Sequence, residues 1–257
     1  MDKYLYRFIS FEAFVGLVQD QALTFVLLSS WDDPMEGDAM YDLIKGLGNS
    51  VQGMLLCIAY YKTFAQCWTS LAESDAMWRI NSHGNRAVRI KIKQSNAEKL
   101  DGVELVKVQY SDEPFEMEPS VHDSLLKALS KKRTAFSHEN EVRLIKRFRF
   151  RNEADAREHI KAFLAANHHP QMTQIIESMF PGQSVEEQVD QLFAMLNIGK
   201  RQISTQTISF ETIPNFIEGV LVHPLAPNWY VKIVEEFCLR NNIPFEGKSM
   251  LYAKPSH

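Results

Sequence analysis

Three separated stretches of the sequence combine residue types that can do chemistry together. Arg7 lies in an aromatic run near the start, Thr69-Ser70 closes a "CWTS" run, and Glu139 and Glu141 stand two residues apart in "FSHENEVRLI". An arginine can hold a phosphate or a ribose oxygen through parallel hydrogen bonds. A fixed carboxylate can offset positive charge that grows in a transition state. These three stretches are therefore the candidate site.

Each stretch also has a purely structural interpretation. Paired glutamates on an edge strand help to keep that strand soluble, and Arg143 on the same strand can pair with Glu141. Thr69 and Ser70 can cap the helix that follows them. Trp78, one turn into that helix, can serve in packing alone.

The acidic run "WDDPMEG" at residues 31–37 offers a different chemistry. Asp32, Asp33 and Glu36 are hard oxygen donors that, with the Glu-x-Glu pair, can hold Mg²⁺ for phosphodiester cleavage. The same run is also typical of a turn followed by a helix N-cap, and we expect no metal. The histidines lack metal-ligand spacing, and the glycines form no phosphate-binding loop.

Strand and helix patterns are interspersed along the first 150 residues. The run "AVRIKIK" at 87–93 alternates apolar and charged residues, which is typical of a half-buried strand. Ser10 is placed to cap a helix that begins at residue 11. Further strands are expected at 4–10, 22–28, 54–61, 64–70 and 103–111, and further helices at about 35–47, 73–81 and 120–132.

The run "ENEVRLIKRFRF" at 139–150 is predicted to be the longest strand. One of its faces is apolar, whereas the other carries Glu139, Glu141 and Arg143. That second face is too polar to be core, so we expect it to line either solvent or a cleft. In this interpretation the two glutamates share one face of one strand.

Residues from about 152 to 199 change character and predict helices only. Strands are again expected at 206–210, 217–224 and 248–253, with a helix at 228–242. Strands and helices do not alternate strictly, so the sequence predicts an α+β fold with mixed or antiparallel sheets and flanking helices. We expect a single domain over residues 1–257 with a helical insertion at about 152–199.

The composition is that of an ordinary globular protein. The chain has 257 residues, of which 45% are hydrophobic and 23% charged, with a formal net charge of −4. An extended nucleic-acid interface usually shows as a basic domain or stripe, so a nucleic-acid partner is not expected, although a local basic groove stays open. Three cysteines without a CxxC pair fit a reducing compartment. No apolar stretch is long enough to cross a bilayer, so we expect a cytoplasmic protein without a membrane partner.

Four motifs resemble those of a bacterial family catalogued as domain of unknown function 2971. They are "YRFIS" (6–10), "WDDPMEG" (31–37), "CWTSLAESDAMW" (67–78) and "ENEVRLI" (139–145). Their order matches the family's aromatic strand, Asp-Pro-x-Glu loop, Cys-aromatic-Ser followed by Met-Trp, and Glu-x-Glu-x-Arg. The resemblance spans about residues 1–225 and implies no particular activity.

A more distant resemblance is to ADP-ribosyltransferases of the Arg-Ser-Glu type. Arg7, Thr69-Ser70 and Glu139-x-Glu141 are similar to that site in order and in kind, with Trp68 where its first serine would stand. The resemblance implies that NAD is a substrate. Breaking the nicotinamide–ribose bond passes through an oxocarbenium-like state, which is the charge type that glycosidase carboxylates stabilise.

This second resemblance implies a role for each candidate residue. Among the catalytic residues, Glu141 would bond the ribose and offset the positive charge, Glu139 would activate an acceptor, and Ser70 would orient the catalytic carboxylate. The expected cofactor-binding residues are Arg7, which would hold a pyrophosphate or ribose oxygen, Thr69, and the aromatic side chains Tyr6, Trp68 and Trp78, which would stack on nicotinamide.

The leading hypothesis is therefore an NAD-using ADP-ribosyltransferase or NAD glycohydrolase-like effector in toxin or phage defence systems, with a nucleotide as its small-molecule partner. A metal-dependent nuclease that uses Asp33 is one alternative. The other is a non-catalytic interaction module whose helical insertion binds a protein partner.

Overall fold

One mixed sheet forms the centre of the fold in a computed structural model that describes residues 2–28, 37–47, 63–147, 153–165, 170–196, 207–213 and 215–253. Within these ranges, eight strands form the sheet in the order β12-β11-β5-β1-β4-β9-β6, and β3 pairs with β4 outside this path. The strands are β1 (Tyr4–Ser10), β3 (Val26–Leu27), β4 (Thr63–Thr69), β5 (Ala87–Lys93), β6 (Val103–Lys107), β9 (Glu141–Arg147), β11 (Gly219–Val222) and β12 (Phe245–Lys248).

Most neighbouring strands of this sheet run antiparallel, and only β11 and β12 pair in parallel. Two small sheets accompany it. They pair β2 (Ala22–Thr24) with β10 (Thr207–Ser209), and β7 (Gln109–Tyr110) with β8 (Lys131–Lys132). The predicted α+β fold with mixed sheets is confirmed.

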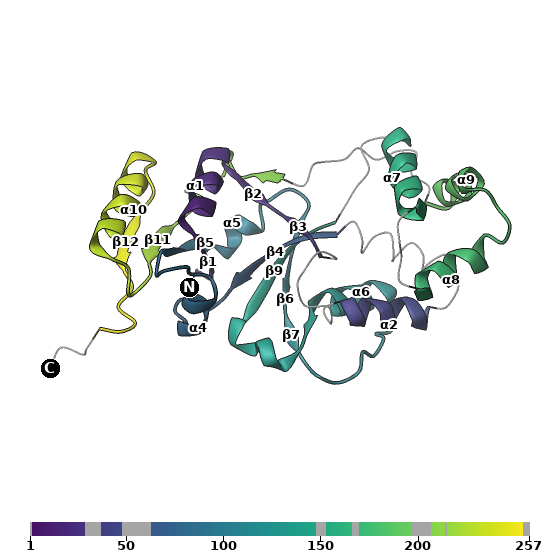
Figure 1. Cartoon of the computed structure of the whole chain (residues 1–257), viewed down its shortest axis with the longest axis horizontal. Coiled ribbons are helices and arrows are strands. Elements are labelled where there is room, and N and C mark those ends of the chain that lie inside the picture. The colour runs from purple at the N-terminus through teal and green to yellow at the C-terminus, as the bar shows by residue number, and fades with distance from the viewer. Residues whose placement is uncertain are drawn as a thin grey trace.

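Helices cover both faces of the main sheet (Figure 1). They are α1 (Phe11–Asp20), α2 (Asp38–Gly46), α4 (Asp75–Ile80), α5 (Gln94–Ala97), α6 (Val121–Ser130), α7 (Glu153–Ala165), α8 (Pro170–Met179), α9 (Val185–Leu196), α10 (Asn228–Arg240) and the 3₁₀ helix η3 (Thr134–Glu139). Serine hydroxyls start several of them, because they accept the otherwise unpaired N–H groups of a first turn. Ser10, for example, accepts a hydrogen bond from the N–H of Ala13, as predicted.

The larger core lies on the face covered by α1 and α10. The predicted alternation of β5 is confirmed, since Val88, Ile90 and Ile92 are fully buried and belong to this core with Phe14 of α1 and Val234 of α10. Strands expose alternate residues to opposite faces, so β5 turns its charged residues the other way. Arg89, the first of these charged residues, is nevertheless also buried, because its guanidinium forms ion pairs across the sheet.

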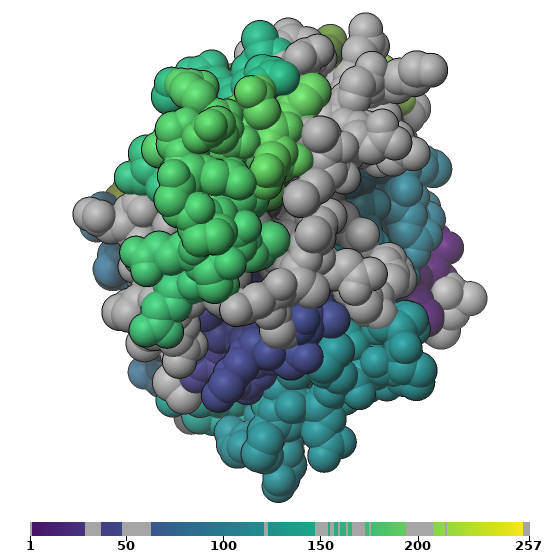
Figure 2. Space-filling view, turned by 90° about the vertical axis from the view of Figure 1, so that its right-hand side faces the viewer, coloured from purple at the N-terminus to yellow at the C-terminus, as the bar shows by residue number. Residues whose placement is uncertain are grey.

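The opposite face carries a second core with α2, α6 and the helical segment. Ala65 of β4 and Ile145 of β9 are buried there together with Leu43 of α2, Ile160 of α7 and Leu192 of α9. The described part of residues 153–196 forms the three helices α7, α8 and α9, with a break at 180–184 between the last two, and contains no strand, as predicted. Figure 2 shows these helices gathered beside α2 at one end of the molecule, so the segment packs on the second core. Among the residues that the structure describes, no helix is long and apolar enough to cross a membrane.

The structure corrects the predicted strand at 139–150 in its first residues. Glu139 ends the helix η3, and Asn140 has φ 43° and ψ 52°, so β9 begins only at Glu141. Asparagine tolerates this left-handed conformation better than most residues, which allows the chain to turn between the two glutamates. The two glutamates therefore do not share one strand.

Other predicted elements differ in smaller ways. The expected strand at 22–28 divides into β2 and β3, and the last strand covers 245–248 instead of 248–253. That strand stops early because the hydroxyl of Ser249 accepts the N–H of Leu251 and turns the chain. The expected strand at 54–61 and most of the acidic loop at 29–38 lie outside the described residues, as do the last three residues of the run 139–150.

Two leucine substitutions test whether the larger core carries the stability of the sheet. Leu144 on β9 is fully buried, whereas Leu239 on α10 is 77% exposed. We expect Leu144→Ala to lower the free energy of unfolding by about 2–5 kcal/mol, because it leaves a cavity. Leu239→Ala should change it by no more than about 0.5 kcal/mol. Urea unfolding measures both, and equal effects would contradict the assignment of the core.

Candidate functional site

The main sheet is open between β1 and β4. These strands share one residue pair, Tyr6 with Thr69, although β1 pairs along its whole length with β5 on its other side. The start of β4 instead pairs with β3, through Ala65 and the residue before it. The stretch 66–68 therefore has no ladder partner on this edge, and a hole is left in the sheet between β1, β3 and β4.

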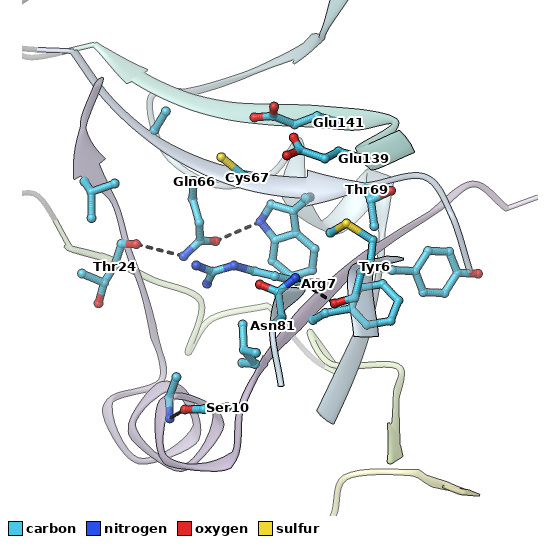
Figure 3. Close-up of a pocket in the computed structure, with 17 residues that line it drawn as sticks. Tyr6, Arg7, Ser10, Thr24, Gln66, Cys67, Thr69, Asn81, Glu139 and Glu141 are labelled. Atoms are coloured by element: carbon cyan, nitrogen blue, oxygen red, sulfur yellow. Dashed lines mark hydrogen bonds between the residues drawn. The ribbon is translucent and has the colours of Figure 1, made fainter. Parts of the chain in front are cut away.

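A cavity of about 370 Å³ occupies this opening (Figure 3). Six of the predicted site residues line it: Tyr6, Arg7, Trp68, Thr69, Glu139 and Glu141. They come from segments far apart in the sequence, and three neighbouring strands or their ends bring them together. Ser70 and Trp78 do not line it, so the cavity collects most but not all of the predicted set.

Glu141 is held at the top of the cavity by a buried charge cluster. Its Oε1 accepts a hydrogen bond from Nε of Arg143 at 2.9 Å, and its Oε2 lies 3.1 Å from Nζ of Lys132. The side chains of Glu141 and Arg143 are 2% and 1% exposed. The structural interpretation that Arg143 pairs with Glu141 is thus confirmed.

The charge of Glu141 is stabilised despite its burial. Burial alone would raise the pKa of this carboxyl group, but the positive charges of Arg143 and Lys132 outweigh it, so the pKa lies below its usual value. Breaking such a buried pair leaves uncompensated charge in a poorly solvated place. Glu141 is therefore ionised and firmly oriented.

Lys132 bridges the two glutamates, which explains how they come together without sharing a strand. Its Nζ lies 2.6 Å from Oε2 of Glu139 and 3.1 Å from Oε2 of Glu141. The Lys132 side chain is 9% exposed and that of Glu139 is 22% exposed. The lysine sits on β8, after α6, and faces the turn formed by η3. One ammonium group thus links both carboxylates.

Glu139 is better placed than Glu141 to contact a ligand. An ionised carboxylate offers about four acceptor positions. Those of Glu141 receive Nε and Nη2 of Arg143, Nζ of Lys132 and the thiol of Cys67. Glu139 accepts from Lys132 and keeps a partly exposed side chain at the cavity. Its other acceptor positions have no partner among the described residues.

Cys67 lies in the middle of the cavity beside Glu141. Its side chain is exposed through the opening, while protein surrounds it on the remaining sides. This crowding, together with the negative charge of Glu141 and a hydrogen bond to it, raises the pKa of the thiol well above its usual value. Cys67 is therefore a neutral hydrogen-bond donor and a poor nucleophile.

Arg7 brings a positive charge to the other side of the opening. It faces Ile90 across the β1–β5 ladder, so its side chain lies on the sheet face of the larger core. In Figure 3 it lies on the opposite side of the β4 ribbon from the two glutamates. Its guanidinium makes no hydrogen bond or ion pair with any residue that the structure describes. Burial lowers its pKa, and a desolvated, unpaired cation favours an anionic partner.

Thr69 and Ser70, the two predicted hydroxyl residues, lie in different surroundings. Thr69 is fully buried, accepts a hydrogen bond from the N–H of Leu71 and donates one to the carbonyl of Asn140. It therefore ties the end of β4 to the turn before β9. Ser70 is exposed and lines a neighbouring cavity instead. Neither hydroxyl contacts a glutamate side chain.

Of the two predicted tryptophans, one lines the cavity and the other does not. Trp68 lines the cavity, and its Nε1 donates to Oε1 of Gln66 at 2.9 Å. Gln66 in turn donates to the carbonyl of Thr24 at 2.9 Å, which closes the gap between β4 and β2. Trp78 is fully buried and packs edge-on against Phe8, with ring centroids 4.7 Å apart. Trp78 thus fits the packing interpretation.

Sequence reasoning missed Cys67 and Gln66, which line the cavity, and Lys132, which pairs with both of its glutamates. Lys132 belongs to the basic end of a predicted helix, and no spacing rule connects it with either glutamate. Cys67 and Gln66 were inside a predicted strand, and alternation alone does not reveal that the strand borders a hole. An odd polar residue such as Gln66 in a run of otherwise buried strand residues was the one available signal.

The candidate metal site cannot be assembled from the described residues. Within them, no group of three or more histidine, cysteine, aspartate or glutamate side chains is arranged to hold a metal ion. Asp32, Asp33 and Glu36 lie outside this part of the chain. The Mg²⁺ hypothesis therefore stays a prediction.

Comparison with known proteins adds no assignment. The chain matches no protein-family model, no curated protein and no solved structure. The two resemblances drawn from its motifs therefore stay predictions.

The first prediction from this site concerns pH. The pKa of Glu141 is lowered on folding, so its ion pairs stabilise the protein above the ordinary glutamate pKa, and this contribution is lost as the pH falls through the lower, folded value. We expect Glu141→Gln to cost about 3 kcal/mol or more near pH 7. The difference from wild type should shrink below about pH 4.

Urea unfolding at several pH values measures this difference. Glu235→Gln, on the exposed face of α10, is the matched control. It should change the free energy of unfolding by no more than about 0.5 kcal/mol at any pH. A cost for Glu141→Gln that stays constant from neutral to acidic pH would contradict the ion-pair account.

The second prediction concerns Cys67. Its raised pKa predicts that iodoacetamide labels it at least about tenfold more slowly than a free thiol near pH 8, even though solvent reaches it. Glu141→Gln removes the negative charge beside the thiol and should speed the labelling. Peptide mapping by mass spectrometry separates Cys67 from Cys57 and Cys238. Labelling of wild-type Cys67 at the rate of a free thiol would show that Glu141 does not raise the pKa of this thiol.

Proposed function

We propose that this chain is an NAD-using enzyme of the ADP-ribosyltransferase or NAD glycohydrolase type, with the opening in the sheet as its nucleotide site. One observation carries the proposal. Arg7, Thr69 and the two glutamates come from three distant segments, on or next to the neighbouring strands β1, β4 and β9, and they line one cavity. Except for Ser70, this is the set, in the same order along the chain, that the resemblance to ADP-ribosyltransferases implies for NAD cleavage.

The charges on the two sides of the cavity support a nucleotide ligand. Glu139 and Glu141 are balanced by Lys132 and Arg143, whereas Arg7 has no acidic partner in the described part of the chain. Among the residues that the structure describes, this leaves one positive charge in excess, at Arg7. A phosphate of a nucleotide would supply the missing negative charge, and a guanidinium can hold it through two hydrogen bonds.

The carboxylates support cleavage at the ribose. In this proposal the bond between the anomeric carbon of the ribose and the nicotinamide nitrogen breaks, and nicotinamide leaves with the bonding electrons. Positive charge then develops on the ribose, which a nearby carboxylate stabilises. Water, or a nucleophile of the acceptor, then bonds to the anomeric carbon and loses a proton. Glu139 has the free acceptor positions for this contact. Glu141 fixes Lys132, and through it the position of Glu139, so it is a positioning residue here.

The dimensions and surroundings of the cavity fit this use. A volume of about 370 Å³ lies within the usual range of roughly 300–1,000 Å³ for small-molecule sites. Trp68 and Tyr6 provide aromatic walls, and the neutral thiol of Cys67 does not compete as a nucleophile. A cytoplasmic effector role in toxin or phage defence, and membership of the domain of unknown function 2971 family, belong to the same proposal through the motif resemblances.

Incubation with NAD tests the proposal. We expect wild type to release nicotinamide. Glu139→Gln and Glu141→Gln should each lower the rate of release by about a hundredfold or more, because the first removes the carboxylate at the reacting carbon and the second removes the charge that positions that carboxylate. Arg7→Lys should raise the KM for NAD, since a lysine does not reproduce the bidentate contact of an arginine with a phosphate. Chromatographic measurement of nicotinamide gives these rates.

Glu235→Gln is again the matched control and should keep the wild-type rate. Circular dichroism checks that each variant is folded under the assay conditions. No nicotinamide release by wild type with NAD and a range of acceptors, or wild-type rates in both folded glutamate variants, would rule the proposal out.

A further inference from the structure

A second cavity lies on the other side of the single residue pair that joins β1 and β4. It has a volume of about 580 Å³ and opens beside the start of β1 and the ends of β4 and β6. Tyr6 lines both cavities, and its pair with Thr69 separates them. Ser70, the predicted site residue missing from the first cavity, lines this one. The two cavities are therefore neighbours across one wall.

The second cavity has an apolar floor and a fixed rim. Leu5, Leu105 and Val142 form the floor. Lys107 stands opposite Val142 in the β6–β9 ladder, so its position at the rim is set by strand pairing. On the other side, the carbonyl of Lys3 accepts the N–H of the first residue of α5 at 2.9 Å. The backbone on both sides of the cavity is thus held by hydrogen bonds.

Two positive charges at this cavity lack a negative partner. Lys3 and Lys107 are exposed, and neither pairs with an acidic side chain in the described ranges. The acidic residue of the lining, Asp2, lies 3.4 Å from Nζ of Lys93, which is also 3.6 Å from Glu218, so the described lining itself carries two positive charges and one negative charge. The protein as a whole carries a formal charge of −4. A local surplus of positive charge beside an apolar floor fits a ligand that is both anionic and partly apolar.

Two tyrosines add an aromatic wall. Nζ of Lys91 lies 4.6 Å from the ring centroid of Tyr4, and the guanidinium carbon of Arg89 lies 4.9 Å from that of Tyr6. Such cation–π contacts fix the rings. Fixed aromatic rings beside lysines are the combination that binds a base together with its phosphate.

We propose that the second cavity binds a nucleoside phosphate. Lys3 and Lys107 hold the phosphate, the base lies against Tyr4, Tyr6 and the apolar floor, and the hydroxyl of Ser70 bonds the sugar or the phosphate. This deepens the proposed function, on which it rests for the source of the ligand. The nucleotide is either the adenylate end of NAD or a separate nucleotide that serves as acceptor beside the first cavity.

Calorimetric titration with adenosine monophosphate tests the site without requiring any catalysis. Wild type should bind it, and binding should weaken as the salt concentration rises, because the contact is largely electrostatic. Lys107→Glu should weaken binding at least tenfold. Lys232→Glu, which makes the same charge change on the exposed face of α10, should leave binding unchanged.

Titration with NAD then separates the two sources. If Lys107→Glu also weakens the binding of NAD, and adenosine monophosphate competes with NAD, the ligand is the adenylate end of the substrate. If the two bind together, the cavity takes a separate nucleotide.

Two results would overturn the site itself. These are no binding of adenosine monophosphate to wild type, and equal weakening by Lys107→Glu and Lys232→Glu. Since these titrations do not involve nicotinamide release, they can fail while the proposed function holds, and the reverse.

Discussion

A strand edge can pair with only one neighbour at each residue, and this constraint shapes the molecule around β4. Its first residues pair with β3 and its last residue pairs with β1, so the stretch between them is left without a partner on that edge. Unpaired backbone inside a sheet is costly unless side chains, water or ligand reach it. Gln66 partly bridges the gap to Thr24. The remaining space is the cavity, which is therefore a consequence of how the strands divide the edge of β4.

The opening also explains why the two sides of the site can carry different charge. Side chains that face opposite ways along neighbouring strands normally never meet, because the sheet separates them. Here Arg7 lies on one face, and Glu141 with its cluster lies on the other. In the proposed function a ligand in the opening contacts both, with its anionic part at the Arg7 guanidinium and its reacting carbon at Glu139. The tightly paired Glu141 supplies rigidity, which pre-organised sites require.

Much of the fold is predictable from local pattern. The strict alternation of β5 and the cap at Ser10 depend on residues close in sequence, and both are confirmed. The site is less predictable, because it depends on contacts between distant segments. Order along the chain brought Arg7 and the glutamates into one candidate set, but it placed both glutamates on one strand. Asn140 turns the chain between them, and Lys132, on another strand, forms an ion pair with each of them and so holds them close together.

The proposed function requires an anionic nucleotide that spans the opening. The most direct measurement is a crystal structure of the protein with ADP-ribose bound. We expect a phosphate oxygen within hydrogen-bond distance of the Arg7 guanidinium, and the ribose beside the Glu139 carboxylate. ADP-ribose bound elsewhere on the molecule, with the cavity between β1, β3 and β4 empty, would contradict the account.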